Sequence, residues 1–413
     1  MTIFKGRDIR GKYGSELSKR DFFNVGLVLN NFSDKLVLGM DYRAHNPELC
    51  QAMLSGFGGS VSYLGNSPSP MVAYLSEKLK LGVCLTASHN PSEYHGAKFF
   101  KEKRSFFENE MNEIKKHYEN LKVENYKLNR EKLAIDNDLR DEYLNKIPLI
   151  EDGIYDLCGG AACSIRDIFP HAIQNKPDPF FENNSPNPND GKLHELKKKT
   201  VSDNKLGFAF DGDADRVVIA ADGKVIRGDI IIAYIAENYL KKGDSVVMSL
   251  DCSNEVYNYI KDSGLNPHYA AVGQETLIKK AQEVNAKFTG EMSHHFSFTE
   301  FMPYSDAIYF AAVFSETKPE DISEFKNKFK NIMHQEVFPF QIDFDKLEEK
   351  LSKKAIPIDK TDGIKATFED YCVLIRASKT EPIVRASIEV EEEYMERAKK
   401  AIREEIMNVK FHL

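Results

Sequence analysis

The apolar run Leu81-Gly82-Val83-Cys84-Leu85 passes directly into Thr86-Ala87-Ser88-His89-Asn90-Pro91-Ser92-Glu93. The run has the length and composition of a buried strand, and the residues that follow have the composition of a loop. The chain therefore presents a serine, a histidine and an asparagine where a strand ends. A serine in such a position can act as a nucleophile or carry a phosphoryl group.

A second strand-like run ends in a loop of carboxylates. Leu206 to Phe210 leads into Asp211-Gly212-Asp213-Ala214-Asp215-Arg216. Three aspartates at alternate positions repel one another unless a cation is bound, and their hard oxygen atoms suit a divalent metal. An EF-hand calcium loop does not fit, because that motif needs glycine at its sixth position and glutamate at its twelfth, where this chain has Arg216 and Asp222. An aspartyl-phosphate phosphotransferase with Asp211 as the nucleophile stays open from this loop alone.

One site explains both loops. A phosphoserine at Ser88 would ligate Mg²⁺ together with the three aspartates, since Mg²⁺ prefers few carboxylates and a phosphate oxygen. A serine hydrolase is disfavoured because the G-x-S-x-G frame is absent around Ser88. Lys98 lies ten residues further on and could neutralise charge or move a proton, although a single lysine is also typical of a protein surface.

Short apolar runs alternate with longer amphipathic segments along the chain, which predicts the α/β class. The length of 413 residues predicts two to four domains. The spacing predicts helices over 276–284 and 391–407, solvated helices within 101–146, and an irregular connection over 174–192.

Composition limits the partners of the protein. A net charge of −8 argues against broad nucleic-acid binding, and no apolar run approaches the roughly 20 residues that cross a membrane. The N-terminus has no signal-peptide core, so we expect a cytoplasmic protein without membrane or nucleic-acid partners. The six cysteines are scattered, which favours buried thiols over a zinc site or a disulfide framework. No pattern indicates an oligomeric state.

Two later loops carry further polar groups. Gly290-Glu291-Met292-Ser293-His294-His295 offers a carboxylate, a hydroxyl and imidazoles, which suit the hydroxyls of a sugar. A zinc pair at His294 and His295 is disfavoured, because neighbouring residues of a strand point to opposite faces. The segment 376–382 offers a guanidinium, hydroxyls and an ammonium, which suit a phosphate dianion, but it also has the composition of a tight hairpin turn.

Taken together, these motifs resemble those of the α-D-phosphohexomutase superfamily, most closely the phosphomannomutase/phosphoglucomutase family. The resemblance covers almost the whole chain and rests on F-K-G-R-D-I-R-G at 4–11, T-A-S-H-N-P at 86–91, D-G-D-A-D-R at 211–216, G-E-M-S at 290–293, and R-x-S-x-T-E-P at 376–382. It implies a four-domain architecture, with three mixed α/β domains and a smaller α+β C-terminal domain around a central cleft. We accordingly expect domains at 1–140, 141–240, 241–333 and 334–413.

The resemblance also implies an isomerase that interconverts hexose 1-phosphate and hexose 6-phosphate. Ser88, stored as phosphoserine and bound to Mg²⁺ with Asp211, Asp213 and Asp215, would donate its phosphoryl group and form a hexose 1,6-bisphosphate, which also serves as activator. His89 and Lys98 are then candidates for proton transfer. Substrate contacts are implied at Arg10, Arg216, Glu291, Ser293, His295, Arg376, Ser378, Lys379, Thr380 and Arg385.

Some positions depart from the family pattern and leave the substrate open. Arg7 stands where tyrosine is common, His95 and Lys379 where asparagine is usual, and Gln274 where histidine is frequent. Mannose is favoured because phenylalanines follow the G-E-M-S loop and its histidine, with glucose second. A phosphoglucosamine mutase is disfavoured by Met292. A non-catalytic sugar-phosphate-binding protein and a simple phosphatase are the remaining alternatives.

Overall fold

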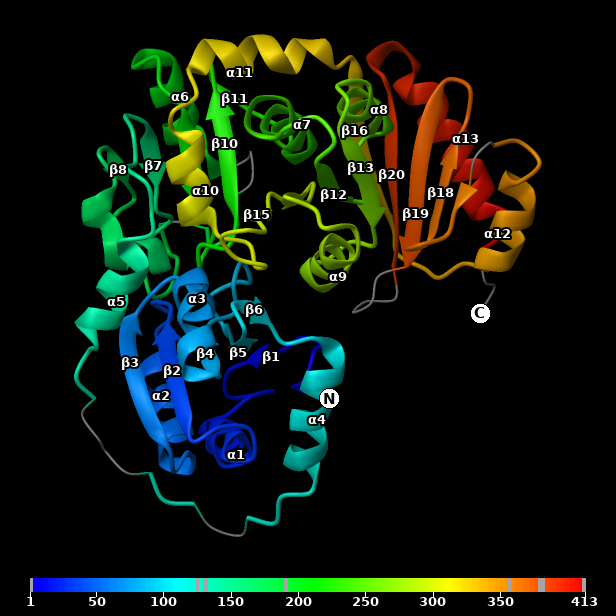
Figure 1. Cartoon of the computed structure of the whole chain (residues 1–413). Helices are drawn as coiled ribbons and strands as arrows, with labels where there is room; N and C mark the ends of the chain where they lie inside the picture. Colours follow the sequence, from blue (N-terminus) through cyan, green and yellow to red (C-terminus); the bar gives the residue numbers. More distant parts are fainter. Residues whose placement is uncertain are drawn as a thin grey trace. The chain divides into compact units, whose positions relative to one another are not determined.

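The computed structural model describes residues 3–123, 126–128, 133–183, 185–188, 192–355, 358–377 and 383–410. The chain divides into two compact units. The first unit contains Met1–Ile226 and His294–Ser323, and the second contains Arg227–Ser293 and Glu324–Leu413. Helices and strands alternate through both units, as the colours along the chain in Figure 1 show, so the predicted α/β class is confirmed.

The first sheet belongs to the N-terminal part of the first unit. Its strands are β1 (Asp8–Lys12), β2 (Lys35–Met40), β3 (Ser60–Asn66), β4 (Gly82–Leu85), β5 (Tyr94–Lys101) and β6 (Arg104–Ser105). They lie in the order β1-β5-β4-β2-β3, with β6 paired to β5. Strand β2 runs parallel to β3 and β4, whereas β5 is antiparallel to β4 and β1. The apolar run 81–85 thus contains a central, fully buried strand, β4.

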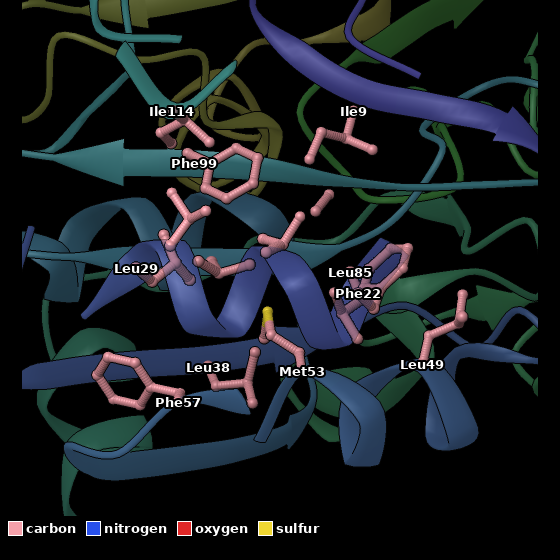
Figure 2. Packing of buried hydrophobic residues seen from close by; sticks show 14 of the residues in the cluster. Ile9, Phe22, Leu29, Leu38, Leu49, Met53, Phe57, Leu85, Phe99 and Ile114 are labelled. Carbon is pink, nitrogen blue, oxygen red and sulfur yellow. The ribbon is translucent and has the colours of Figure 1, made fainter. Parts of the chain in front are cut away.

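Helices α1 (Lys19–Leu29), α2 (Asn46–Gly56) and α3 (Ser69–Leu79) pack with this sheet. Figure 2 shows the core that α1 and α2 form with the sheet, where Phe22 and Leu29 of α1 pack with side chains of the strands. Helices α1 and α2 approach closely because each has a glycine at the contact. A Cβ at Gly26 would lie 2.0 Å from the Met53 oxygen, and one at Gly56 would lie 2.2 Å from the Phe23 oxygen. Both positions therefore exclude any side chain.

The second sheet of the first unit has the order β11-β10-β9-β7-β8. Its strands are β7 (Ile154–Asp156), β8 (Ala172–Ile173), β9 (Gly207–Phe210), β10 (Val217–Ala221) and β11 (Lys224–Val225), and α6 (His194–Ser202) packs on it. The unit also contains α4 (Glu108–Glu119), α5 (Asn137–Leu144), the 3₁₀ helix η1 (Ala161–Ile168), β15 (Phe296–Phe298) and α10 (Ala307–Phe314). Helix α11 spans Pro319–Phe325.

The second unit contains a parallel and an antiparallel group of strands. β12 (Ser245–Ser249) lies between β13 (Asn266–Ala270) and β14 (Phe288–Gly290) and is parallel to both, with α7 (Gly228–Tyr239), α8 (Asn254–Asp262) and α9 (Gln274–Val284) packed against these strands. The antiparallel sheet has the order β16-β20-β19-β18-β17. Its strands are β16 (Asn331–Phe338), β17 (Ile358–Asp359), β18 (Ile364–Thr367), β19 (Tyr371–Ala377) and β20 (Val384–Glu391), with helices α12 (Phe344–Leu351) and α13 (Met395–Met407).

Several expectations for single elements can be compared with the structure. The helix predicted over 276–284 is confirmed as α9, and all six cysteines are buried free thiols. The last helix begins at Met395 rather than 391, because Glu392–Tyr394 form a 3₁₀ turn. Among the helices of the described residues, none combines the length and apolar character that a membrane span requires. The four domain boundaries stay a prediction.

Candidate active site

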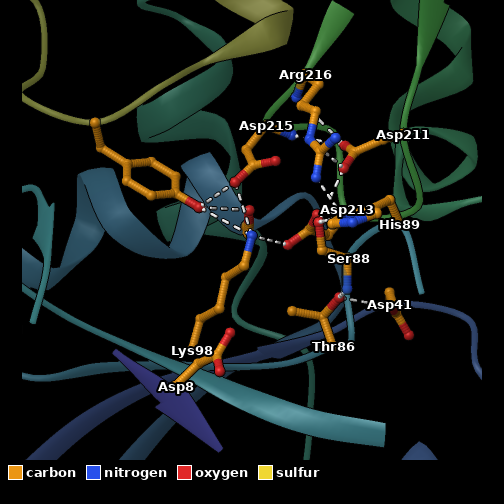
Figure 3. A network of polar contacts seen from close by, with 12 residues as sticks. Asp8, Asp41, Thr86, Ser88, His89, Lys98, Asp211, Asp213, Asp215 and Arg216 are labelled. Carbon is orange, nitrogen blue, oxygen red and sulfur yellow. Dashed lines mark hydrogen bonds and ion pairs between the residues drawn. The ribbon is translucent and has the colours of Figure 1, made fainter. Parts of the chain in front are cut away.

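The serine loop and the carboxylate loop meet inside the first unit (Figure 3). Ser88 lies in the loop after β4. Asp211 is the first residue of the loop 211–216, which connects β9 to β10. The Ser88 Oγ donates a hydrogen bond of 3.0 Å to Asp211 Oδ2, across 123 residues of chain. Gly212 permits this approach, because a Cβ there would lie 2.5 Å from the Ser88 carbonyl oxygen. The loops contact each other through backbone as well as side chains.

The three aspartates form a compact group of buried carboxylates. One oxygen from each of Asp211, Asp213 and Asp215 lies within 4.8 Å of the others. Neither oxygen of Asp213 accepts a hydrogen bond from the described residues. Burial, followed by the charges of Asp215 and Asp213, raises the pKa of Asp211 to about 7. Clustered carboxylates with few hydrogen-bond donors around them offer oxygen ligands that fit a divalent cation such as Mg²⁺.

Lys98 projects from β5 toward this group. Its Nζ lies 2.7 Å from Asp215 Oδ2, to which it donates a hydrogen bond, and 2.7 Å from Asp213 Oδ2, outside hydrogen-bond geometry. Burial lowers the pKa of Lys98, but the charges of Asp213 and Asp215 outweigh it and hold the pKa well above its usual value. The buried Tyr304 hydroxyl donates to Asp215 Oδ2 at 2.8 Å and accepts from Lys98 at 3.3 Å. Lys98 therefore partly compensates the carboxylates.

His89 and Arg216 border the Ser88 Oγ on another side. His89 Nδ1 lies 3.4 Å from Ser88 Oγ and is also in contact with the Arg216 guanidinium. Burial and then the charge of Arg216 lower the pKa of His89 to about 2, so its imidazole is neutral. Arg216 Nε lies 3.7 Å from Asp211 Oδ2. A pKa this low makes the imidazole a weak base, so only its position beside the Ser88 hydroxyl supports a part in proton transfer.

Arg10 and His295 complete the sequence-predicted residues of the first unit. Arg10 pairs with Asp8 and donates to Asn90 Oδ1 at 2.6 Å. A backbone bridge joins His295 to Arg216, and the His295 Nε2 lies 3.5 Å from Asp215 Oδ1. Both residues therefore border the loops that carry Ser88 and the aspartates.

The remaining predicted residues lie in the second unit. After β14, Glu291 accepts hydrogen bonds from the Gly273 N–H at 2.7 Å and from the Ser293 hydroxyl at 3.0 Å. Arg376 and Arg385 are directly opposite each other on β19 and β20. Arg376 is paired with Asp362 at 3.3 Å. Two guanidiniums on one face of an antiparallel pair repel, which favours a bound anion.

Three predicted phosphate-binding residues, Ser378, Lys379 and Thr380, lie outside the described residues. Of the positions that depart from the family pattern, His95 is buried and pairs through Nδ1 with Asn46 Oδ1 at 3.1 Å. Burial and then Arg43 lower its pKa to about 3. Gln274 begins α9, and Arg7 is half-buried. His95 thus contacts the first residue of α2 and the rings of Tyr13 and His45.

Sequence reasoning missed Tyr304, Arg43, Asp41 and Thr86, all of which are buried beside the site. Asp41 and Arg43 follow the end of the buried strand β2, and charged residues at such a position could have been predicted as site residues. Tyr304 carried no signal, because its contacts come from residues that are far away in the sequence.

Three family profiles match the chain. They are described as phosphoglucomutase/phosphomannomutase alpha/beta/alpha domain I at residues 1–125, domain II at 162–224 and domain III at 227–333. A phosphomannomutase of Methanocaldococcus jannaschii is 30% identical over 444 residues, covering 99% of this chain and 97% of that protein. A probable phosphoglucosamine mutase of Methanocella arvoryzae is 28% identical over 428 residues, with 95% of each covered.

The fold is also similar to a solved structure. A phosphoglucomutase/phosphomannomutase family protein of Burkholderia thailandensis superimposes with a TM-score of 0.85 at 22% identity, covering 98% of this chain and 97% of that one. At this identity the likeness concerns the fold alone, and it agrees with the α/β domains expected above.

Proposed function

The chain belongs to the phosphoglucomutase/phosphomannomutase family, and we propose that this phosphohexomutase converts hexose 1-phosphate to hexose 6-phosphate reversibly through a phosphorylated Ser88. The observation that supports this most directly is the 3.0 Å hydrogen bond from Ser88 Oγ to Asp211 Oδ2 within a cluster of three buried carboxylates. We also propose the four domains 1–140, 141–240, 241–333 and 334–413.

The reaction consists of two balanced transfers. In the first, the bond between phosphorus and Ser88 Oγ breaks, a bond to the sugar O6 forms, the sugar hydroxyl loses its proton and Ser88 gains one. The product is hexose 1,6-bisphosphate. In the second, the phosphoryl group on O1 moves to Ser88 Oγ, and the protons move in the reverse sense. A bisphosphate added from outside regenerates phosphoserine, which makes it an activator.

The residues of the first unit have different roles at the reacting atoms. His89, 3.4 Å from Ser88 Oγ, is a candidate for passing on the proton of the serine hydroxyl. Asp211, Asp213, Asp215 and Ser88 would hold Mg²⁺, which supplies positive charge to the transferring phosphoryl group. Lys98 keeps Asp213 and Asp215 close together and is a second candidate for proton transfer. Arg10 and Arg216 orient the substrate.

Substrate recognition is assigned to the other predicted residues. Glu291 and Ser293, already joined by a hydrogen bond, contact sugar hydroxyls together with His295. Arg376 and Arg385 bind the phosphate that does not react, with Ser378, Lys379 and Thr380. Mannose is the favoured sugar and glucose the second. Glucosamine is an alternative, supported by the likeness to a probable phosphoglucosamine mutase.

The test compares mannose, glucose and glucosamine 1-phosphates in parallel assays, with Mg²⁺ and a trace of hexose 1,6-bisphosphate. We expect conversion to the 6-phosphates, fastest for mannose, and none by Ser88→Ala. Turnover by Ser88→Ala would refute the serine mechanism. Release of inorganic phosphate without the 6-phosphate would indicate a phosphatase, and binding without turnover of any sugar would indicate a sugar-phosphate-binding protein.

A further inference from the structure

Arg43 is a fully buried arginine whose guanidinium is committed to one loop. It follows β2, and its side chain is 0% exposed. Its two terminal nitrogens donate four hydrogen bonds, all to backbone carbonyls of residues 88–94. The acceptors and distances are Ser88 O at 2.7 Å, Asn90 O at 2.6 Å, Pro91 O at 2.7 Å and Tyr94 O at 2.9 Å. One guanidinium is thus hydrogen-bonded to carbonyls along the whole serine loop.

Asp41 links the same arginine to the backbone N–H of Ser88. One of its oxygens, Oδ2, accepts from Arg43 Nε at 3.2 Å and from the Thr86 hydroxyl at 2.7 Å. The Thr86 oxygen in turn accepts from the Ser88 N–H at 2.8 Å (Figure 3). Ser88 is therefore held at its carbonyl by Arg43 and at its N–H by Thr86.

The two backbone hydrogen bonds, from Arg43 and to Thr86, hold a residue with an unfavourable backbone conformation. Ser88 has a φ of 50°, in the left-handed region that residues with a side chain seldom occupy. Such a conformation persists only where surrounding contacts determine it. Arg43 and Thr86 contact the backbone of Ser88 itself, at its carbonyl and at its N–H. The result is the orientation that directs Ser88 Oγ toward Asp211 and His89.

We propose that Arg43 is a positioning residue for phosphoryl transfer, which fixes the serine loop from behind so that Ser88 Oγ stays aligned with the aspartate group. The inference rests on the proposed function, because it assigns Arg43 a part in the chemistry of Ser88. Arg43 donates all its terminal hydrogen bonds within the protein, and the Phe181 ring lies 5.3 Å from the guanidinium carbon. It therefore acts through the loop and not on the substrate.

Lysine cannot replace this arrangement. A guanidinium presents five donors in a plane, and here they reach four carbonyls and one carboxylate. An ammonium has three donors and is a point charge. A lysine therefore keeps the ion pair with Asp41 but loses some of the hydrogen bonds to the carbonyls of residues 88–94. A displacement of about 1 Å at a reacting group lowers turnover by roughly 100-fold.

The experiment compares Arg43→Lys with a matched control, Arg140→Lys. Arg140 also donates to backbone carbonyls of the first unit, at Leu64, Asn66 and Ser164, but none belongs to the serine loop. Both variants are assayed for kcat, KM and melting temperature, and the phosphoserine content is measured by intact mass. We expect Arg43→Lys to lower kcat about 100-fold with little change in KM, whereas Arg140→Lys keeps its kcat.

Two further variants separate positioning from folding. Thr86→Val breaks the other hold on Ser88 and should also lower kcat while KM stays near its original value. Arg43→Ala should recover part of its kcat when guanidinium is added at concentrations far below those that unfold proteins, and Arg140→Ala should not respond. A kcat of Arg43→Lys equal to that of the unchanged protein overturns the proposal, and so does an equal loss in both lysine variants. Turnover by Ser88→Ala would instead refute the proposed function itself.

Discussion

The serine and aspartate loops of the first unit and the arginine pair of the second unit gather charge of opposite sign. Asp211, Asp213 and Asp215 bring three carboxylates within 4.8 Å, whereas Arg376 and Arg385 oppose each other on neighbouring strands. Like charges repel in both arrangements, and neighbouring groups of opposite charge offset part of this repulsion. The comparison supports the proposal that the first region binds a cation and the second an anion.

The two regions also differ in how their charge is supported. The carboxylates are buried and touched by Lys98, Arg216, Tyr304 and Ser88, whose own loop is fixed by Arg43. At the arginine pair, Asp362 balances Arg376 from a neighbouring turn. Bond making requires fixed geometry, and recognition of a phosphate requires mainly charge.

The largest effect is expected for Asp213→Asn. The substitution removes one of the three charges, so we predict that Mg²⁺-dependent turnover falls about 1,000-fold. The rise in melting temperature on adding Mg²⁺ after treatment with a chelator should shrink as well. The control is Asp222→Asn, an exposed turn residue just after β10 whose backbone conformation suits asparagine. Turnover of Asp213→Asn that equals that of the control would contradict a cation site.

A smaller effect of a different kind is expected for Arg385→Gln. Loss of one guanidinium should raise KM about 10- to 100-fold, since a charged hydrogen bond contributes roughly 1.5–3 kcal/mol, with a lesser change in kcat. Stabilisation by inorganic phosphate in a thermal melt should weaken in parallel. Arg397→Gln, at an exposed arginine of α13 that pairs with Asp370, serves as the control. A loss of kcat at constant KM would show that this region acts in bond making.

The smallest effect concerns a buried carboxyl outside the aspartate group. Asp306 caps α10 through the N–H groups of Ile308 and Tyr309, and burial raises its pKa from 3.8 to about 6. Because the folded pKa is above the unfolded one, the folded chain takes up a proton first as the pH falls. The free energy of unfolding should therefore rise relative to Asp306→Asn between about pH 6 and pH 4, by at most about 3 kcal/mol.

Urea unfolding followed by circular dichroism, in the presence of a chelator, measures this difference at each pH. Asparagine can still cap α10, so the two proteins differ at this position in the titratable group and not in the helix. A difference that is constant from pH 7 to pH 4 would show that Asp306 does not titrate in this range. Addition of Mg²⁺ should leave the difference unchanged, in contrast with Asp213.

The sequence was informative where chemistry is concentrated in one short string. The loops at Ser88 and Asp211 each follow an apolar strand, and shared chemistry linked them before their 3.0 Å contact was known. Arg43 was not predictable in the same way, because its acceptors are backbone carbonyls, which every residue possesses. The start of α13 was missed because helical periodicity continues through the 3₁₀ turn at Glu392–Tyr394.

The contact between Ser88 and Asp211 has a consequence for synthesis and folding. The two residues are 123 positions apart, so the pairing forms only after a long stretch of chain has been made and a large loop has closed. A nascent chain that has folded only its first sheet holds the serine without its carboxylate partner. The Ser88 hydroxyl therefore lacks this partner on the ribosome until the strands on both sides of the aspartate loop have folded.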